Sequence, residues 1–136
     1  MLNQVESSFE RIMIIDDDDV DAYVFSKLIS KNNFAQNILK YNSAEKALNY
    51  IIENKENQLL MPQIIFLDIY MPNMNGFEFL ENLKKVFKKT IRNCKIIIVS
   101  SSIDDSDISR VKLDNCISLF AVKPVTKKIF EDLISL

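Results

Sequence analysis

Acidic side chains follow two apolar runs of this chain at the point where each run ends. Asp16 and Asp17 come directly after RIMII (Arg11–Ile15), and Asp68 closes the run QIIFL (Gln63–Leu67). Three carboxylates within a few ångströms of one another would repel and would raise each other's pKa unless a cation lay between them. Mg²⁺ suits a site of few carboxylates that waters and phosphate oxygens complete. We therefore predict a divalent-metal site at which Asp16 and Asp17 are ligands.

The acids that come next have a simpler interpretation. Asp18, Asp19 and Asp21 follow the pair, and negative charge is favoured in the first turn of any helix. We interpret these three residues as the solvated beginning of a helix.

Asp68 has the chemistry of a nucleophile toward phosphorus. A carboxylate beside Mg²⁺ can form an acyl phosphate, because the metal screens both anions and orients the phosphoryl group in line. Lys123 could neutralise phosphoryl oxygens as a point charge, and Ser100 could donate a hydrogen bond to one of them. Each residue alone is also consistent with a structural role: a turn-forming Asp68, an exposed Lys123 at a strand end, and Ser100 in a loop.

Two residues that restrict the backbone stand near these candidates. Gly76 is the only glycine of the chain and follows Asn75 in the segment that leaves Asp68. A lone glycine usually stands where the backbone needs φ > 0 or a close approach, and Asn-Gly is a turn pair. We expect this turn to fix the loop after Asp68 and to start a helix. Pro124 ends a strand, and a cis bond before it could set the direction of the Lys123 side chain.

Regular elements must position these residues, and the hydropathy pattern predicts five strands that alternate with five helices. Short apolar runs at 11–15, 63–67, 95–99 and 117–122, with a weaker one near 37–41, indicate buried strands. The first helical stripe consists of Val20, Val24 and Leu28. The other four stripes are Ala44, Ala47, Leu48 and Ile51; Phe79 or Leu80 with Leu83 and Phe87; Ile108 and Val111; and Ile129, Leu133 and Leu136.

Cap residues support these helices. Ser43 precedes the second helix, Asp104 with Asp107 resembles a capping box for the fourth, and Thr126 can cap the fifth. Asn115 tolerates the left-handed conformation and is expected to end the fourth helix.

The alternating elements predict one α/β domain with a parallel sheet and helices on both faces. Ligands of such sheets bind beyond the carboxyl ends of the strands, where the strand order reverses. Asp16, Asp17, Asp68, Ser100 and Lys123 are therefore expected at one edge of the sheet.

Composition excludes several classes of function. The 136 residues suit one domain, and a net charge of -2 gives no sign of binding to nucleic acid or to a membrane surface. The absence of histidine excludes a His-based triad and a His-ligated zinc. Cys94 and Cys116 are too few for a disulfide framework. No apolar run approaches about 18 residues and no signal peptide is present, so we expect a cytoplasmic protein.

Taken together, these features resemble the receiver domains of two-component response regulators. The matching segments are IMIIDDDD (12–19), IIFLDIYMPNMNGFEFL (64–80), IIIVSSS (96–102) and FAVKP (120–124), in the family's order and spacing. Each segment alone is weak evidence, whereas the combination is highly specific. The resemblance implies a CheY-like, flavodoxin-like doubly wound (βα)5 sandwich with the strand order 2-1-3-4-5.

The resemblance also implies the metal site and the acceptor. Asp68 matches the phosphoacceptor, and Asp16 and Asp17 match the acidic pair. Asp17, Asp68 and the backbone carbonyl of Tyr70 would be the nearest protein ligands of Mg²⁺, with Mn²⁺ as an alternative.

A switch and its partners are implied as well. Ser100 matches the Ser/Thr switch position, Phe120 the aromatic switch residue, and Lys123 the family's lysine. Phosphorylation would draw Ser100 inward and let Phe120 rotate, which reshapes the surface of the fourth helix, fifth strand and fifth helix. The phosphoryl donor would be a histidine kinase or a histidine phosphotransfer protein. The active form would be a monomer or a phosphorylation-dependent dimer.

The resemblance begins near residue 11, so we expect residues 1–10 to be an N-terminal extension and residues 11–136 to be the receiver domain. Because the chain stops at the fifth helix, we expect a stand-alone receiver that controls a separate protein, unless it is an excerpt of a longer chain. Tyr70 and Ser102 line the path of the hydrolytic water in this family. Their identity here leaves the lifetime of the phosphorylated state open.

Three alternatives are less consistent with the residues. A receiver-like module that works without phosphorylation would lack one of the acids or the lysine, and none is missing. A phosphatase would usually have a second aspartate where Tyr70 stands, so we expect no enzyme activity beyond self-phosphotransfer and autodephosphorylation. A nucleotide- or flavin-binding domain would need a glycine-rich phosphate loop, which a chain with one glycine cannot form. FMN could also bind through a polar, hydroxyl-rich loop, but no such loop follows the first strand.

Overall fold

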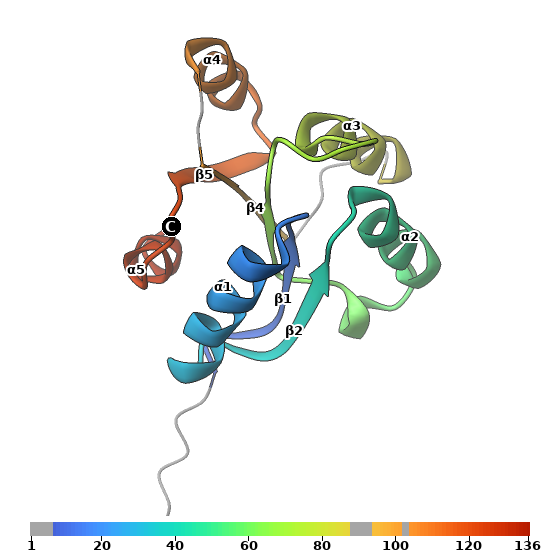
Figure 1. Ribbon diagram of the computed structural model, residues 1–136. Coiled ribbons are helices and arrows are strands. Elements are labelled where there is room, and N and C mark those ends of the chain that lie inside the picture. The colour runs from blue at the N-terminus through green and yellow to red at the C-terminus, as the bar shows by residue number, and fades with distance from the viewer. Residues whose placement is uncertain (1–6, 88–93, 102–103) are drawn as a thin grey trace, which may run out of the picture.

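A computed structural model describes residues 7–87, 94–101 and 104–136 of the chain. Within these ranges the chain forms a five-stranded sheet in the order β2-β1-β3-β4-β5, and neighbouring strands are parallel. Helices cover both faces of the sheet (Figure 1). The predicted doubly wound α/β fold and its strand order are therefore confirmed.

Strands and helices alternate along the chain. The strands are β1 (Phe9–Ile15), β2 (Ala35–Tyr41), β3 (Ile64–Leu67), β4 (Lys95–Ser100) and β5 (Ile117–Val122). The helices are α1 (Asp19–Lys31), α2 (Ala44–Asn54), α3 (Gly76–Val86), α4 (Asp105–Leu113) and α5 (Lys128–Ile134), with a short 3-10 helix η1 (Gln58–Leu60) before β3. Strands β1 and β2 begin two residues earlier than expected, and β4 continues to Ser100.

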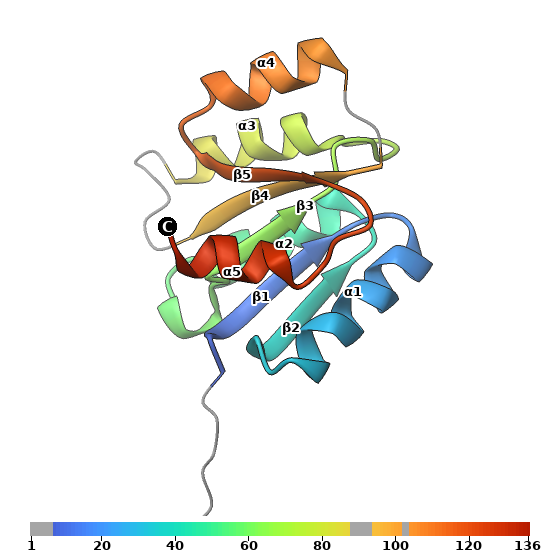
Figure 2. The ribbon, with the colours of Figure 1, turned by 90° about the vertical axis from the view of Figure 1, so that its left-hand side faces the viewer.

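Both faces of the central strands lie in the core, which explains their continuous apolar runs. Along β1, Ile12 and Ile14 pack in one cluster with residues of α1 and α5, whereas Met13 and Ile15 pack in the other with residues of α2 and α3. Figure 2 shows α1 and α5 together on one side of the sheet. Burying each such side chain contributes about 1.5 to 3 kcal/mol, so polar residues are disfavoured until the strand ends at Asp16.

Helix α1 buries a different face from the one that the sequence pattern indicated. Val20 and Val24 are 70% and 61% exposed, and Ala22 and Phe25 are buried instead. The rings of Phe25 and Phe66 meet edge to face with 4.5 Å between their centroids. Both stripes have helical spacing, so the packing of the large aromatic ring decided which of them faces the sheet. Of the stripe of Val20, Val24 and Leu28, only Leu28 packs against the core.

Side-chain caps begin most of the helices. Ser43 accepts a hydrogen bond from the backbone N–H of Lys46 at the start of α2, as expected. Asp104 and Asp107 form the expected capping box of α4. A further capping box begins α3, where the Asn75 side chain and Glu78 each bond to the other's backbone N–H.

Two expected caps were wrong. Thr126 does not cap α5, because Lys127 precedes that helix with helical backbone angles and without a side-chain cap bond. Asn115 does not end α4 in the left-handed conformation. The helix ends at an extended Asp114, whose carboxylate accepts a hydrogen bond from the backbone N–H of Cys116 at 2.9 Å. This side-chain turn makes the reversal into β5 that a left-handed residue was expected to make.

We expect Asn75→Ala to lower the free energy of unfolding by about 1 kcal/mol, because the backbone N–H of Glu78 at the start of α3 loses its partner, the Asn75 side chain. Asn82→Ala is the matched control, since Asn82 bonds to a carbonyl inside the same helix. Its effect should stay below about 0.5 kcal/mol. Urea denaturation of both variants measures the difference. Equal losses of stability would show that the capping box stabilises the protein no more than the Asn82 hydrogen bond does.

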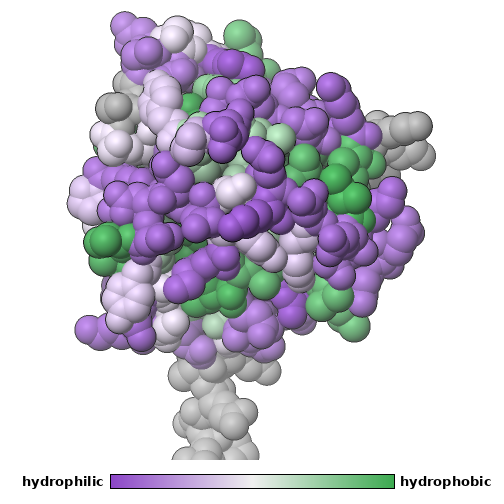
Figure 3. Space-filling model, turned by 45° about the vertical axis from the view of Figure 1, so that its right-hand side comes forward, coloured by the Kyte–Doolittle hydropathy of each residue, from purple (hydrophilic) through white to green (hydrophobic). Residues whose placement is uncertain are grey.

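The face of the molecule toward α2 is mainly polar (Figure 3). The view of Figure 3, toward the α2 side of the molecule, shows hydrophilic side chains over most of the face and hydrophobic ones in separate patches. Among the described helices, none has both the length and the apolar character that crossing a membrane requires.

Candidate functional site

Backbone hydrogen bonds extend the strand ladders to the residues that were expected at the carboxyl edge. The N–H of Asp16 bonds to the carbonyl of Tyr41 at 3.0 Å, and the N–H of Asp68 bonds to the carbonyl of Ile15 at 3.0 Å. The N–H of Lys123 bonds to the carbonyl of Ser100 at 2.9 Å. The site residues are therefore attached to the rigid sheet rather than to free loops.

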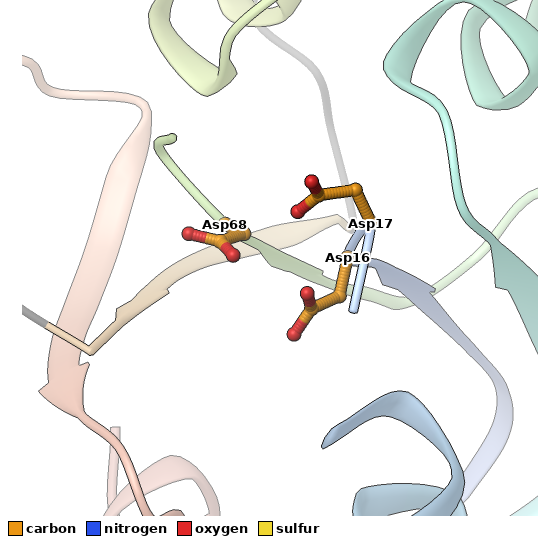
Figure 4. Close-up of side chains that lie close together, drawn as sticks. All are labelled: Asp16, Asp17 and Asp68. Carbon is orange, nitrogen blue, oxygen red and sulfur yellow. The ribbon is translucent and has the colours of Figure 1, made fainter. Parts of the chain in front are cut away.

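Three carboxylates meet at this edge. Asp16 and Asp17 follow β1, Asp68 follows β3, and one oxygen of each lies within 4.8 Å of the others (Figure 4). Asp16 and Asp68 are 7% and 8% exposed, whereas Asp17 is open to solvent. Three hard oxygen ligands with one open side suit Mg²⁺, which keeps several waters and binds through few carboxylates. The side chains present therefore fit a divalent ion.

Lys123 neutralises part of this negative charge. Its ammonium nitrogen lies 2.7 Å from Asp16 Oδ2, 3.3 Å from Asp68 Oδ2 and 3.0 Å from Asp21 Oδ2. The peptide bond between Lys123 and Pro124 is cis. Burial by itself would lower the pKa of Lys123, but hydrogen bonds to Asp16 and Asp21 raise that pKa above its ordinary value. The ammonium therefore stays charged at neutral pH.

Asp21 was missed by the sequence interpretation, which assigned it to a solvated helix start. Its backbone N–H does bond to Asp18, the N-cap of α1, at 3.1 Å. Its carboxylate, however, points to Lys123 from the first turn of that helix. A hint was present in the sequence, because the first turn after β1 must lie over the same edge of the sheet as the acids that end the strand.

Asp68 is an unusually weakly acidic carboxyl group. Burial raises its pKa to about 6, and the neighbouring charge of Asp16 raises it as well. Lys123 and the backbone N–H of Tyr70, which lies 3.3 Å from Asp68 Oδ1, oppose this shift. The site without metal thus holds more negative charge than its single lysine balances, and a divalent cation would relieve this.

Gly76 lies directly against the backbone of Asp68 and Ile69. A Cβ atom at this position would lie 2.5 Å from the carbonyl oxygen of Asp68 and 3.0 Å from the Cα of Ile69. The N–H of Gly76 bonds to the carbonyl of Ile69 at 2.8 Å. Close approach is therefore the reason for this glycine, and its φ is not positive. The left-handed residue of the loop is Asn73, with φ 68°.

Tyr70 connects the segment after Asp68 to α4. Its hydroxyl donates a hydrogen bond to the carboxylate of Asp107, the same residue that closes the capping box of α4. This hydrogen bond and the nearby charge raise the pKa of Tyr70 to about 12. The side chain is 50% exposed and lies at the rim of the site. Whether its carbonyl binds metal stays a prediction, and Ser102 lies outside the described residues.

The two expected switch residues differ in exposure. Ser100 ends β4 and is 2% exposed, so it is buried beside the site. Phe120 is 37% exposed on β5, opposite Ile98 of β4. Along β5 the burial alternates, since residues such as Leu119 face the sheet's α5 side while Phe120 faces outward.

The fold and the site define a class of protein: doubly wound α/β domains with an acidic cluster at the carboxyl edge of a parallel sheet. A family model described as response regulator receiver domain matches residues 12–135. The chain belongs to the response regulator receiver family.

Solved structures agree with this assignment. A two-component response regulator from Cytophaga hutchinsonii has a TM-score of 0.86 and 25% identity, covering 93% of this chain and 95% of that one. The receiver domain of the histidine kinase CKI1 from Arabidopsis thaliana, complexed with Mg²⁺ and BeF3⁻, has a TM-score of 0.77 and covers 93% and 91% of the two chains. At 22% sequence identity, this similarity is evidence for a shared fold only.

A sequence relative shows the same domain in a longer protein. The protein-glutamate methylesterase/protein-glutamine glutaminase of Treponema denticola is 35% identical over 117 residues. The match covers 86% of this chain but 28% of that protein, so the activity of the whole relative does not transfer.

Proposed function

We propose that this receiver is a phosphorylation-controlled switch in which Asp68 accepts a phosphoryl group from a phosphohistidine. The observation that supports this most directly is the meeting of Asp68 with Asp16, Asp17 and the ammonium of Lys123, which lies 3.3 Å from Asp68 Oδ2. A nucleophilic carboxylate, a metal-binding pair and a charged donor are the groups that phosphoryl transfer to an aspartate needs.

These positions support the proposed transfer. An oxygen of Asp68 forms a bond to phosphorus while the bond from phosphorus to the donor's imidazole nitrogen breaks. The electron pair of that bond stays on the nitrogen, which then takes a proton from solvent. Lys123 already lies beside Asp68, so its ammonium can bind a phosphoryl oxygen without a large movement.

Asp16, Asp17 and Asp68 would hold Mg²⁺, or Mn²⁺ in its place, with the backbone carbonyl of Tyr70 as a further ligand. When bound, the ion supplies charge neutralisation and in-line orientation of the phosphoryl group. The CKI1 receiver complexed with Mg²⁺ and BeF3⁻ supports this ligand class for the family's fold.

The output would be a change of surface. Buried Ser100 would bond to a phosphoryl oxygen, and Phe120, 37% exposed, would rotate inward. The surface of α4, β5 and α5 would then bind a downstream protein. The donor would be a histidine kinase or a histidine phosphotransfer protein, and the phosphorylated form a monomer or a dimer.

The test is phosphorylation by acetyl phosphate. With Mg²⁺ present, we expect intact-protein mass spectrometry to show one added phosphoryl group per chain, and chelation of the metal should abolish it. Asp68→Asn should not be labelled. Asp19→Asn is the matched control, because Asp19 is an exposed acid of the same run outside the metal cluster. Labelling that persists in Asp68→Asn, or is lost equally in Asp19→Asn, would overturn the assignment of the acceptor.

A further inference from the structure

Lys123 has one carboxylate partner that does not belong to the metal cluster. Its three N–H groups face three acids, and Asp16 and Asp68 are both members of the cluster with Asp17. The third partner is Asp21, whose Oδ2 lies 3.0 Å from the ammonium nitrogen. The lysine is thus held from two sides, by the acids that end the strands and by the first turn of α1.

Asp21 differs from Asp16 and Asp68 once a metal ion is bound or Asp68 is phosphorylated. A divalent ion bound by the cluster draws carboxylate charge from Asp16 and Asp68, which weakens their attraction for Lys123. An oxygen of Asp68 is also consumed when it bonds to phosphorus. Asp21 alone of the three described partners keeps its full charge for the lysine in that state.

The geometry of α1 makes Asp21 a firm anchor. The N-cap Asp18 accepts hydrogen bonds from the backbone N–H groups of Val20 and Asp21, at 3.0 and 3.1 Å, which fixes the first turn of the helix. The Lys123 side chain is 14% exposed and that of Asp21 is 44% exposed, so the pair lies at the rim of the site with the lysine inside.

From these contacts we infer that Asp21 is a positioning residue, which holds the Lys123 ammonium toward α1 beside Asp68 and so limits its competition with the metal for the oxygens of Asp16 and Asp68. This inference rests on the proposed phosphoacceptor function. Without Asp21, the ammonium would be shared by Asp16 and Asp68 alone. It would then compete with the metal for their oxygens and would be less well placed for a phosphoryl oxygen.

The experiment compares Asp21→Asn with Asp19→Asn, which removes an equal charge from the same helical turn, whereas the ion pairs of Lys123 within the described residues are with Asp16, Asp21 and Asp68. Mg²⁺ affinity is measured by calorimetry without any phosphoryl donor, and the phosphorylation rate with acetyl phosphate is measured separately. For a partly exposed ion pair we expect Asp21→Asn to weaken both about threefold to tenfold. For Asp19→Asn we expect about twofold or less, since solvent screens the exposed charge.

Two further variants separate positioning from charge and from folding. Asp21→Glu should recover most of the loss, and the variants of Asp21 and Asp19 should show the melting temperature of the parent within a few degrees. In the Lys123→Ala background, Asp21→Asn should affect Mg²⁺ affinity no more than Asp19→Asn does, because the competing ammonium is gone.

Equal effects of Asp21→Asn and Asp19→Asn, or an undiminished effect of Asp21→Asn in the Lys123→Ala background, would overturn the inference. Failure of the parent protein to be phosphorylated at Asp68 would instead overturn the proposed function. In that case the donor-free Mg²⁺ titrations still decide whether Asp21 positions Lys123.

Discussion

Gly76→Ala is expected to lower the free energy of unfolding by about 3 kcal/mol, because the new methyl group would overlap backbone atoms that cannot turn away. Its Cβ would lie 2.5 Å from the Asp68 carbonyl oxygen. The expected destabilisation is opposite in sign to the usual effect of replacing a helical glycine by alanine. At an unconstrained helix position, alanine in place of glycine is favourable by about 0.5 to 1 kcal/mol.

The same substitution should also disturb Asp68, the proposed phosphoacceptor. The atoms in the way belong to Asp68 and Ile69 themselves, so relief of the overlap moves the segment that holds the carboxylate. Urea denaturation and the phosphorylation rate are the two measurements, with Lys85→Ala as the control at an exposed position of α3. A variant as stable as the parent, or more stable, would show that the loop accommodates a side chain and that the close approach is not required.

The second large effect concerns the charge of Asp68 in the protein without metal. Its pKa is raised to about 6 in the folded protein, above the value of about 3.9 expected when unfolded. The folded state therefore binds the proton more tightly than the unfolded state. The corresponding stability is fully present below about pH 4 and is lost as the pH rises through about 6.

Asp68→Asn should consequently stabilise the metal-free protein at neutral pH, on the order of 2 kcal/mol, by removing a buried charge that repels Asp16. The gain should shrink as the pH falls below about 6 and should vanish near about pH 4. Urea denaturation with a chelator, across that pH range, measures this dependence. Asp19→Asn serves as the control, and a variant less stable than the parent at neutral pH would contradict the expectation.

With Mg²⁺ present, the parent should become more stable than Asp68→Asn. Millimolar Mg²⁺ is expected to raise the melting temperature of the parent, because an ion that binds the folded state alone stabilises it. The rise should be much smaller for Asp68→Asn, which lacks one of the three carboxylates of the cluster. A melting temperature of the parent that does not respond to Mg²⁺ would count against the metal site.

The chemical identity of the site could be predicted from local patterns. A buried strand must be apolar until it leaves the core, so the first acids after RIMII and QIIFL had to lie at the edge of the sheet. Parallel strands bring those ends together, and the distances among Asp16, Asp17 and Asp68 agree with that. For the same reason Lys123 was expected beside them, and its contacts with Asp16 and Asp68 confirm its place.

The fold class followed from the same periodicity, but details that depend on competition between similar partners did not. Two apolar stripes of α1 have helical spacing, and the fit of Phe25 against Phe66 selected the one that is buried. Val20 and Val24 were left exposed for this reason. Likewise, the side chain of Asp114 made the turn after α4 that was expected of Asn115.

Asp68 and its cluster were thus determined by the sequence itself, since the end of a buried strand fixes where a side chain emerges. The tertiary structure alone decided which residues of the helices contact the residues at this edge of the sheet. Tyr70 reaches Asp107 across 37 positions of the chain, and Asp21 reaches Lys123 across 102. Periodicity carries no information on such contacts, because they depend on the distance between elements that pack only once the whole sheet has formed.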